Sequence, residues 1–197
     1  AVGSMVEQFV INGYGMLFLA GFTATNKLYG ILEIAATSYG FAVTSYVGQN
    51  LGARLVRRIK KGLRSAALIA LVTSVIIGVA MLVFGRLVLG LFISGDPQQV
   101  EASMEIAYHY LSIMSVCLPI LYMLHIYRSA LMGLGDTVVP MLSGFAEMVV
   151  RIGVALLLPI WMGQEGIYYA EVGAWTAAAI ILVTAYYLRM GALSRRN

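Results

Sequence analysis

Long runs of hydrophobic residues without a charged side chain divide this chain into segments. Three such runs, residues 34–53, 65–85 and 106–127, each hold about 20 residues and no Asp, Glu, Lys or Arg. An α-helix needs about 20 mainly apolar residues to cross the hydrocarbon of a bilayer. The pattern therefore predicts membrane-spanning helices, with the charged residues gathered in short clusters between them.

Turn residues between the runs predict where the helices end. Asn-Gly-Tyr-Gly at residues 12–15 is one such turn; the rival interpretation is one continuous span through residues 8–26. Asp96 could cap a helix that starts after Pro97. We expect a helical stub over residues 1–12, followed by five helices over residues 16–52, 62–92, 98–132, 138–161 and 167–190. The stub is too short to span, so we expect it to be the end of a cut helix in a fragment of a longer protein.

Composition supports a membrane protein made of helices. Sixty per cent of the residues are hydrophobic and 11% are charged, against about 45–50% and 25% in soluble proteins. Backbone groups in lipid must be satisfied within helices or a closed barrel, and these runs are too long and alternate too weakly for barrel strands. We therefore expect an all-α, polytopic transmembrane helix bundle, with residues 1–197 forming a single transmembrane domain. The lone Cys117 excludes an internal disulfide.

The charges also predict an orientation. If residues 54–64 form a cytoplasmic loop, alternation places the end of the helix over 98–132 and the C-terminus on the same side. That side then holds these ten basic residues: Arg54, Arg57, Arg58, Lys60, Lys61, Arg64, Arg128, Arg189, Arg195 and Arg196. The opposite turns hold these charged residues: Arg86, Asp96, Glu101, Glu165 and Glu171. The excess of positive charge predicts a multi-pass protein of the cell membrane with the Arg54–Arg64 loop and the C-terminus cytoplasmic, and it explains the net charge of +4 without a nucleic-acid partner.

Four segments carry a family resemblance. A helix ending in Val-Gly-Gln-Asn-Leu-Gly-Ala at residues 47–53, followed by basic residues, resembles the multidrug and toxic compound extrusion (MATE) family of transporters. Met-Gly-Leu-Gly-Asp-Thr at 132–137, Glu147 with Arg151, and Glu-Val-Gly-Ala-Trp at 171–175 agree with the family in order and spacing. The motif residues are Gly48, Gln49, Asn50, Gly52, Ala53, Gly133, Gly135 and Asp136.

The resemblance implies a fold and an activity. The family has twelve helices in two six-helix lobes that face a central cavity, so this chain resembles a C-terminal lobe with a truncated first helix and no N-terminal partner lobe. Members export cationic or amphipathic compounds in exchange for Na⁺ or H⁺. We accordingly expect such substrates, the lipid bilayer and the missing lobe as partners, a coupling ion, no other cofactor, no metal site and no catalysis. Residues 117–127 lack the carboxylate that some members carry there, so the coupling carboxylate could lie in the missing lobe or be Glu33.

Glu33 is the first candidate for chemistry. A charge at the bilayer centre costs about 2.5–3.5 kcal/mol on insertion scales, so it faces the bundle interior or water. Its neighbours at helical spacing are polar or small, namely Asn26, Gly30, Thr37, Gly40, Thr44 and Gly48, which suits a close helix contact or a cavity wall. The sequence leaves two roles open, a proton- or cation-responsive carboxylate and one kept neutral or hydrogen-bonded for packing. Lys27 could extend its ammonium group to the interface.

The remaining candidates lie on this helix and on two others. Glu147 and Arg151 are four residues apart and can pair on one helix face, either as a fixed ion pair or as one that rearranges. His125 could assist proton coupling or simply be satisfied in the bundle, while His109 points to another face near the outer surface. The other cavity candidates are Asn26, Tyr29, Thr37, Tyr39 and Tyr122. The three tyrosine rings could bind cations or anchor the membrane interface.

Three alternatives to a drug exporter agree less well with the sequence. A flippase for lipid-linked oligosaccharides of the same superfamily should line its cavity with several basic residues, and only Lys27 and Arg151 are available within the expected spans. An intramembrane enzyme would need a nucleophile and base or a metal cluster, and the chain has no His-Glu-x-x-His or Gly-x-Ser-x-Gly motif. A small scaffold or oligomeric channel would not explain the four family-like segments.

Overall fold

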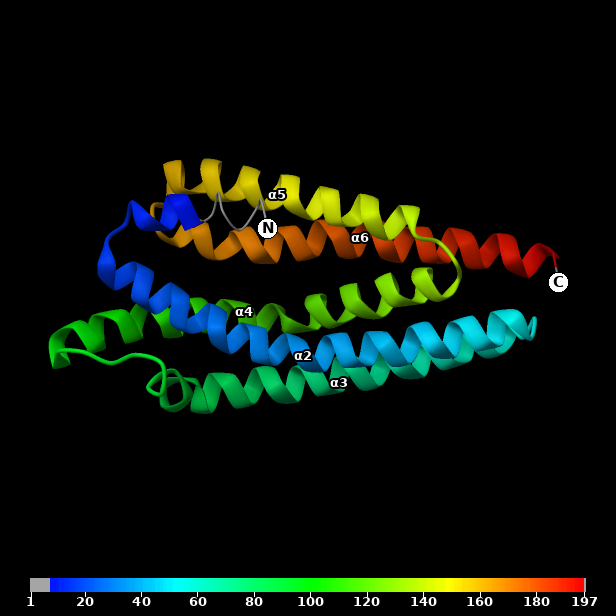
Figure 1. Ribbon diagram of the computed structural model, residues 1–197, viewed down its shortest axis with the longest axis horizontal. Coiled ribbons are helices and arrows are strands. Elements are labelled where there is room, and N and C mark those ends of the chain that lie inside the picture. Colours follow the sequence, from blue (N-terminus) through cyan, green and yellow to red (C-terminus); the bar gives the residue numbers. More distant parts are fainter. Residues whose placement is uncertain (1–7, 197) are drawn as a thin grey trace.

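The computed structural model describes residues 8–196, and every regular element in that range is helical. Residues 8–12 are helical and the rest of the predicted stub, residues 1–7, lies outside the described residues. Five long helices follow: α2 Met16–Gly52, α3 Val56–Leu89, α4 Pro97–Gly133, α5 Val138–Met162 and α6 Glu165–Arg196. They run side by side as one elongated bundle (Figure 1), as the predicted all-α architecture requires.

The bundle is organised around α4. This helix packs against α2, α3 and α6, whereas α5 packs almost entirely on α6. The result is a group of α2, α3 and α4 beside a pair of α5 and α6, joined through the contact of α4 with α6 (Figure 1). The buried side chains of α4, which include Tyr110, Leu118 and Tyr122, form much of the common core.

Most helix boundaries follow the turn residues, but the expected start of α3 and the expected end of α6 were wrong, since α6 continues to Arg196 rather than ending at residue 190. Residues 13–15 interrupt the helix and Gly15 has a φ of 93°, so the rival continuous span through residues 8–26 is excluded. The helix α3 begins at Val56 rather than at residue 62, because long basic side chains can reach the interface while the backbone stays helical. Asp96 stands at the N-cap of α4 but makes no side-chain cap hydrogen bond.

Close helix contacts depend on small residues. A Cβ on Gly21 of α2 would lie 2.6 Å from the Ser103 carbonyl oxygen of α4, and one on Gly133 would lie 2.8 Å from the Thr44 carbonyl oxygen of α2. Such spacings exclude any larger side chain. Small residues let helix backbones approach within a membrane, so these glycines fix how closely α2 and α4 pack.

Four of the described helices, α3 to α6, are long and apolar enough to cross a membrane. Five spans were predicted, and α2 has the length, at 37 residues, but is not among the four. Its Thr, Ser and Tyr residues and Glu33 are spread along the helix, so no stretch of α2 is as apolar as the most apolar stretches of α3 to α6. A helix of this kind is stable in a bilayer when its polar side chains face the bundle interior.

The turns fall at two opposite ends of the bundle. The α2–α3 turn, the α4–α5 turn and the C-terminus share one end, and the α3–α4 and α5–α6 connections share the other (Figure 1). This alternation is the one on which the charge-based orientation depends.

Candidate functional site

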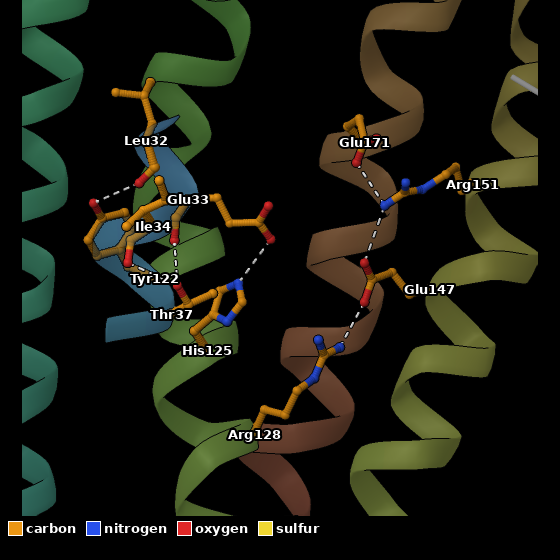
Figure 2. Close-up of polar contacts among 10 residues, drawn as sticks. All are labelled: Leu32, Glu33, Ile34, Thr37, Tyr122, His125, Arg128, Glu147, Arg151 and Glu171. Atoms are coloured by element: carbon orange, nitrogen blue, oxygen red, sulfur yellow. Dashed lines mark hydrogen bonds and ion pairs between the residues drawn. The ribbon is translucent and has the colours of Figure 1, made fainter. Parts of the chain in front are cut away.

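Glu33 and His125 form a pair between α2 and α4. Glu33 stands near the midpoint of α2, and its Oε1 lies 3.5 Å from Nε2 of His125. The His125 side chain is largely buried, at 13% exposed, and that of Glu33 is 37% exposed. The carboxylate points toward the side of the bundle where α5 and α6 lie (Figure 2). The structure thus places His125, an independent candidate from the sequence, beside Glu33.

Two further candidates lie on the same helix as Glu33. The ring of Tyr29 stacks on that of Trp175 from α6, with centroids 5.4 Å apart. The side-chain oxygen of Asn26 accepts a hydrogen bond of 3.3 Å from the Tyr110 hydroxyl. The Tyr29–Trp175 stack therefore joins α2 to α6 one helical turn from Glu33.

The other polar candidates are engaged in helix packing. The hydroxyl of Thr37 donates to the carbonyl oxygens of Glu33 and Ile34 in its own helix. Tyr122 is fully buried and donates to the Leu32 carbonyl oxygen at 3.4 Å, and Tyr39 bonds Thr73 of α3 at 2.9 Å. Both rings thus pack among α2, α3 and α4, and a role of Tyr39 and Tyr122 in a cavity wall stays a prediction.

A second cluster of charges links α4, α5 and α6. The predicted pair is present, with Arg151 Nη2 3.2 Å from Glu147 Oε1. Each member also has a partner on another helix: Arg128 Nη2 of α4 lies 2.7 Å from Glu147 Oε2, and Arg151 Nη2 lies 2.8 Å from Glu171 Oε2 of α6. Figure 2 shows the four side chains in a row of alternating sign. We call Arg128, Glu147, Arg151 and Glu171 the charge ladder.

Sequence reasoning missed the two outer members of the ladder. Arg128 was assigned to the cytoplasmic end and Glu171 to an outer turn, yet their side chains are only 24% and 10% exposed. The signal for Glu171 was its position six residues inside α6, where a lone carboxylate needs a partner. No comparable signal pointed to Arg128, because its partner is on another helix.

The first family-like motif forms the end of α2. Asn50 is buried, and its side-chain amide donates to the Tyr46 carbonyl oxygen at 2.7 Å while its own carbonyl accepts from Leu55. Gln49 and Gly48 are exposed. Gly52 ends α2, and Ala53 follows as its C-cap. These residues terminate a helix and place the turn that follows, so the described contacts give them a structural role.

The second motif forms a clamp between α5 and α6. Gly135 has a φ of 81°, a backbone conformation that favours glycine. The Asp136 carboxylate accepts from the backbone amides of Val138 and Val139 at 3.2 and 3.1 Å, and from Nε of Arg189 at 2.9 Å. The Val139 amide and the Arg189 guanidinium hold the pKa of Asp136 below its ordinary value. Asp136 therefore caps α5 and fastens it to α6.

Two remaining basic or aromatic candidates lie toward the other end of the bundle. Lys27 is exposed and borders a hollow with Thr23 and Ser103. His109 is exposed and its ring meets the edge of Tyr168 at 5.5 Å. Neither contacts Glu33 or the charge ladder in the described contacts.

Comparisons with known sequences agree on one family. The family model MatE matches residues 1–157. The probable multidrug resistance protein YpnP of Bacillus subtilis (strain 168) is 28% identical over 166 residues, which cover 84% of this chain and 36% of that protein. The chain thus spans about a third of the length of this curated relative.

Solved structures share the fold. A MOP superfamily transporter from Pyrococcus furiosus Vc1 (DSM3638), described as having a binding pocket of reverse polarity, matches with a TM-score of 0.86 over 98% of this chain and 44% of its own, at 18% identity. An outward-facing and an inward-facing structure of a multidrug resistance MATE family transporter of the MOP superfamily match with the same TM-score, 0.83. They are each 18% identical and cover 96% and 94% of this chain and 41% of their own.

Proposed function

Because this chain belongs to the MatE family, we propose that it is one six-helix lobe of a secondary transporter that exports cationic or amphipathic compounds in exchange for Na⁺ or H⁺. The family match and the transporter relatives support this role. A partner lobe supplies the other wall of the cavity. On this proposal the two lobes rock about the bound compound and expose it to one side of the membrane at a time.

The Glu33–His125 pair is the observation that carries the residue-level proposal. The two side chains lie 3.5 Å apart near the middle of α2, and an ionisable residue at membrane depth marks an ion or substrate pathway by default. Protonation of Glu33 removes the negative charge that a cationic compound would need. A proton and a cationic cargo therefore compete for one carboxylate, which is the requirement for exchange.

The charge ladder is a poorer candidate for coupling. Glu147 and Glu171 are held by Arg128 and Arg151 at 2.7–3.2 Å, and guanidinium groups stay charged in proteins. The partner of Glu33 is an imidazole, which changes charge near neutral pH. The Glu33 pair is therefore the better candidate for coupling, and we assign the ladder to holding α4, α5 and α6 together.

Rocking requires a lobe that keeps its shape. The chain matches the outward-facing and inward-facing MATE structures equally well, which supports motion of the lobe as a unit. The Arg128–Glu147 bond strengthens that unit, since α5 otherwise makes few contacts with α4.

We propose that the α2–α3 turn and the C-terminus are cytoplasmic in a cell membrane. The two lie at the same end of the bundle (Figure 1), and six basic residues of 54–64 and three at the tail share that end. This excess of Lys and Arg is the bias that orients helices in membranes.

A flippase for lipid-linked oligosaccharides is not favoured. Such a cavity should offer several cationic groups to a pyrophosphate. In the described spans Arg128 and Arg151 are already bound to carboxylates. Lys27 lies apart from them, beside the hollow that it borders with Thr23 and Ser103.

Transport in vesicles tests the role of Glu33. Coupling free energies between two sites are typically about 1–3 kcal/mol, or about 5–150-fold. We therefore expect Glu33→Gln in the complete transporter to lower gradient-driven export of a cationic drug by at least about fivefold, with little change in the folded amount in the membrane. The assay is drug uptake into inverted vesicles with an imposed Na⁺ or H⁺ gradient.

Glu101→Gln is the matched control, because Glu101 is 70% exposed and 3.8 Å from Arg86. It should transport like the unaltered protein. Normal export by Glu33→Gln would remove Glu33 from the mechanism, whereas no gradient-driven export by the unaltered protein would refute the exchange itself.

A further inference from the structure

A pocket lies between α3, α4 and α6 at the end of the bundle that holds the α2–α3 turn. It has a volume of about 270 Å³, slightly below the range of about 300–1,000 Å³ that is typical of sites for drug-sized molecules. We call it the α3–α6 pocket. Its lining residues are Lys60, Leu63, Arg64, Tyr127, Tyr186, Tyr187, Met190 and Gly191.

The lining is cationic. Lys60 and Arg64 are four residues apart on α3 and both face the pocket, and no carboxylate is among the lining residues. Within the described residues neither cation is within ion-pair distance of a carboxylate; Lys60 instead donates to the Ser194 hydroxyl at 2.5 Å. The pocket therefore carries two positive charges that the protein itself does not neutralise.

Three tyrosines form a rigid wall around these charges. Tyr186 is buried and meets Tyr127 and Tyr187 edge to face, with centroids 5.4 and 5.5 Å apart. The hydroxyls of Tyr127 and Tyr187 lie 3.4 Å apart. Only one of the two can donate in that bond, so the other hydroxyl keeps a proton that it can donate to an anion.

The position of the pocket specifies the kind of anion. The lining residues are four to ten residues from the ends of the three helices, and basic side chains as long as Lys60 and Arg64 can extend from there to the lipid headgroups. Buried Leu63 and Met190 add an apolar floor beside the charges. Basic pockets between spanning helices at a cytoplasmic face suit anionic headgroups, and tyrosine is enriched at this interface.

We propose that the α3–α6 pocket binds the phosphate of an anionic phospholipid, such as phosphatidylglycerol. Lys60 and Arg64 hold the phosphate, a tyrosine hydroxyl donates to it, and the acyl chains continue along the lipid-facing surface of the bundle. A lipid held here bridges α3 and α6, which scarcely touch each other directly. The site is independent of the transported compound.

Lipid titration followed by native mass spectrometry tests the proposal. The complete transporter in neutral detergent is titrated with phosphatidylglycerol and, separately, with phosphatidylcholine of the same chains. We expect Lys60→Gln with Arg64→Gln to weaken the first phosphatidylglycerol about 30-fold and to leave phosphatidylcholine unchanged. That factor is about 2 kcal/mol at 1.4 kcal/mol per tenfold, or about 1 kcal/mol for each basic residue.

The matched control is Arg57→Gln with Arg58→Gln, which removes the same charge from exposed positions one turn away. A specific pocket predicts a clearly smaller loss there, and equal losses from both double variants would mean a diffuse basic surface and overturn the proposal. Displacement of the lipid by an equal concentration of inorganic phosphate would also overturn it, in favour of a free anion. Should the double variant not fold, Lys60→Gln alone is expected to lose about fivefold.

Discussion

Glu147 is the residue whose removal should most disturb the lobe. It accepts from two guanidinium groups, Arg128 at 2.7 Å and Arg151 at 3.2 Å. Its alanine variant would leave the two arginines in different situations. Arg151 keeps Glu171 at 2.8 Å, whereas Arg128 has no other carboxylate partner among the described residues, and its buried Nε already lacks a hydrogen bond there.

The magnitude follows from Arg128. Breaking a buried ion pair from one side costs about 3–5 kcal/mol. The side chain of Arg128 is 24% exposed, so part of its charge can be solvated. We therefore expect Glu147→Ala to lower the free energy of unfolding by about 3 kcal/mol.

Neutral replacement of both partners should recover much of that loss. Replacing a whole ion pair is often close to neutral, since no charge is left buried. We expect Arg128→Gln to rescue Glu147→Gln by about 1–2 kcal/mol, which is toward the upper end of coupling energies measured between helices in membranes. Arg151→Gln should not rescue it, because that change strands Glu171 instead.

Reversible unfolding of the complete transporter in mixed micelles with increasing SDS measures these differences. Glu101→Ala, at an exposed pair of 3.8 Å, serves as the control and should change stability by less than about 0.5 kcal/mol. Additive losses in the Arg128 and Glu147 double variant would refute the reasoning. Rescue by Arg151→Gln alone would show that Arg151 is the stranded charge.

Two further predictions concern Asp136, at the end of the bundle with the α4–α5 turn, and a third concerns the proposed orientation. Asp136→Ala should cost about 1–2 kcal/mol, the sum of a lost helix cap and an ion pair whose arginine is 60% exposed, whereas Asp136→Asn keeps a cap acceptor and should cost less. Folding lowers the pKa of Asp136, so its negative charge stabilises the folded protein at pH values above the unfolded pKa of about 3.9. That stabilisation is lost as the pH falls through the lower pKa of the folded state. The free energies of unfolding of the wild type and of Asp136→Asn should therefore converge in acid. In a Cys117→Ala background, Ser94→Cys should react with an impermeant maleimide on intact cells and Arg58→Cys should not; the reverse pattern would refute the proposed orientation.

The helices could be predicted because their causes are local. A run without charge and a turn rich in glycine each act through neighbouring residues, and the observed ends of α2, α4 and α5 lie within one or two residues of the expected ones. The errors at the start of α3 and the end of α6 have one cause. Basic residues such as Arg57 and Arg195 were read as loop, yet a helix continues past the hydrocarbon when its long side chains can reach water.

The site could be predicted only where partners share a helix or carry an unusual charge. Glu147 and Arg151 are four residues apart, so their pairing was visible in the sequence. Glu33 was visible as a charge inside a span, but its distance to His125 depends on how α2 packs on α4. That packing is set by contacts such as Gly133 against Thr44, which no periodicity in a single segment reveals.

The partner of each carboxylate separates structural charges from functional ones in this lobe. Each carboxylate inside the described spans needs a partner, and pairing alone does not distinguish Glu33 from Glu147 or Glu171. The chemistry of the partner does, because an arginine stays charged in proteins whereas an imidazole can change charge near neutral pH. A neutral substitution in the ladder should therefore appear first as lost stability, and one at Glu33 first as lost coupling. A variant of Glu147 that folds normally but exports without a gradient requirement would reverse that assignment.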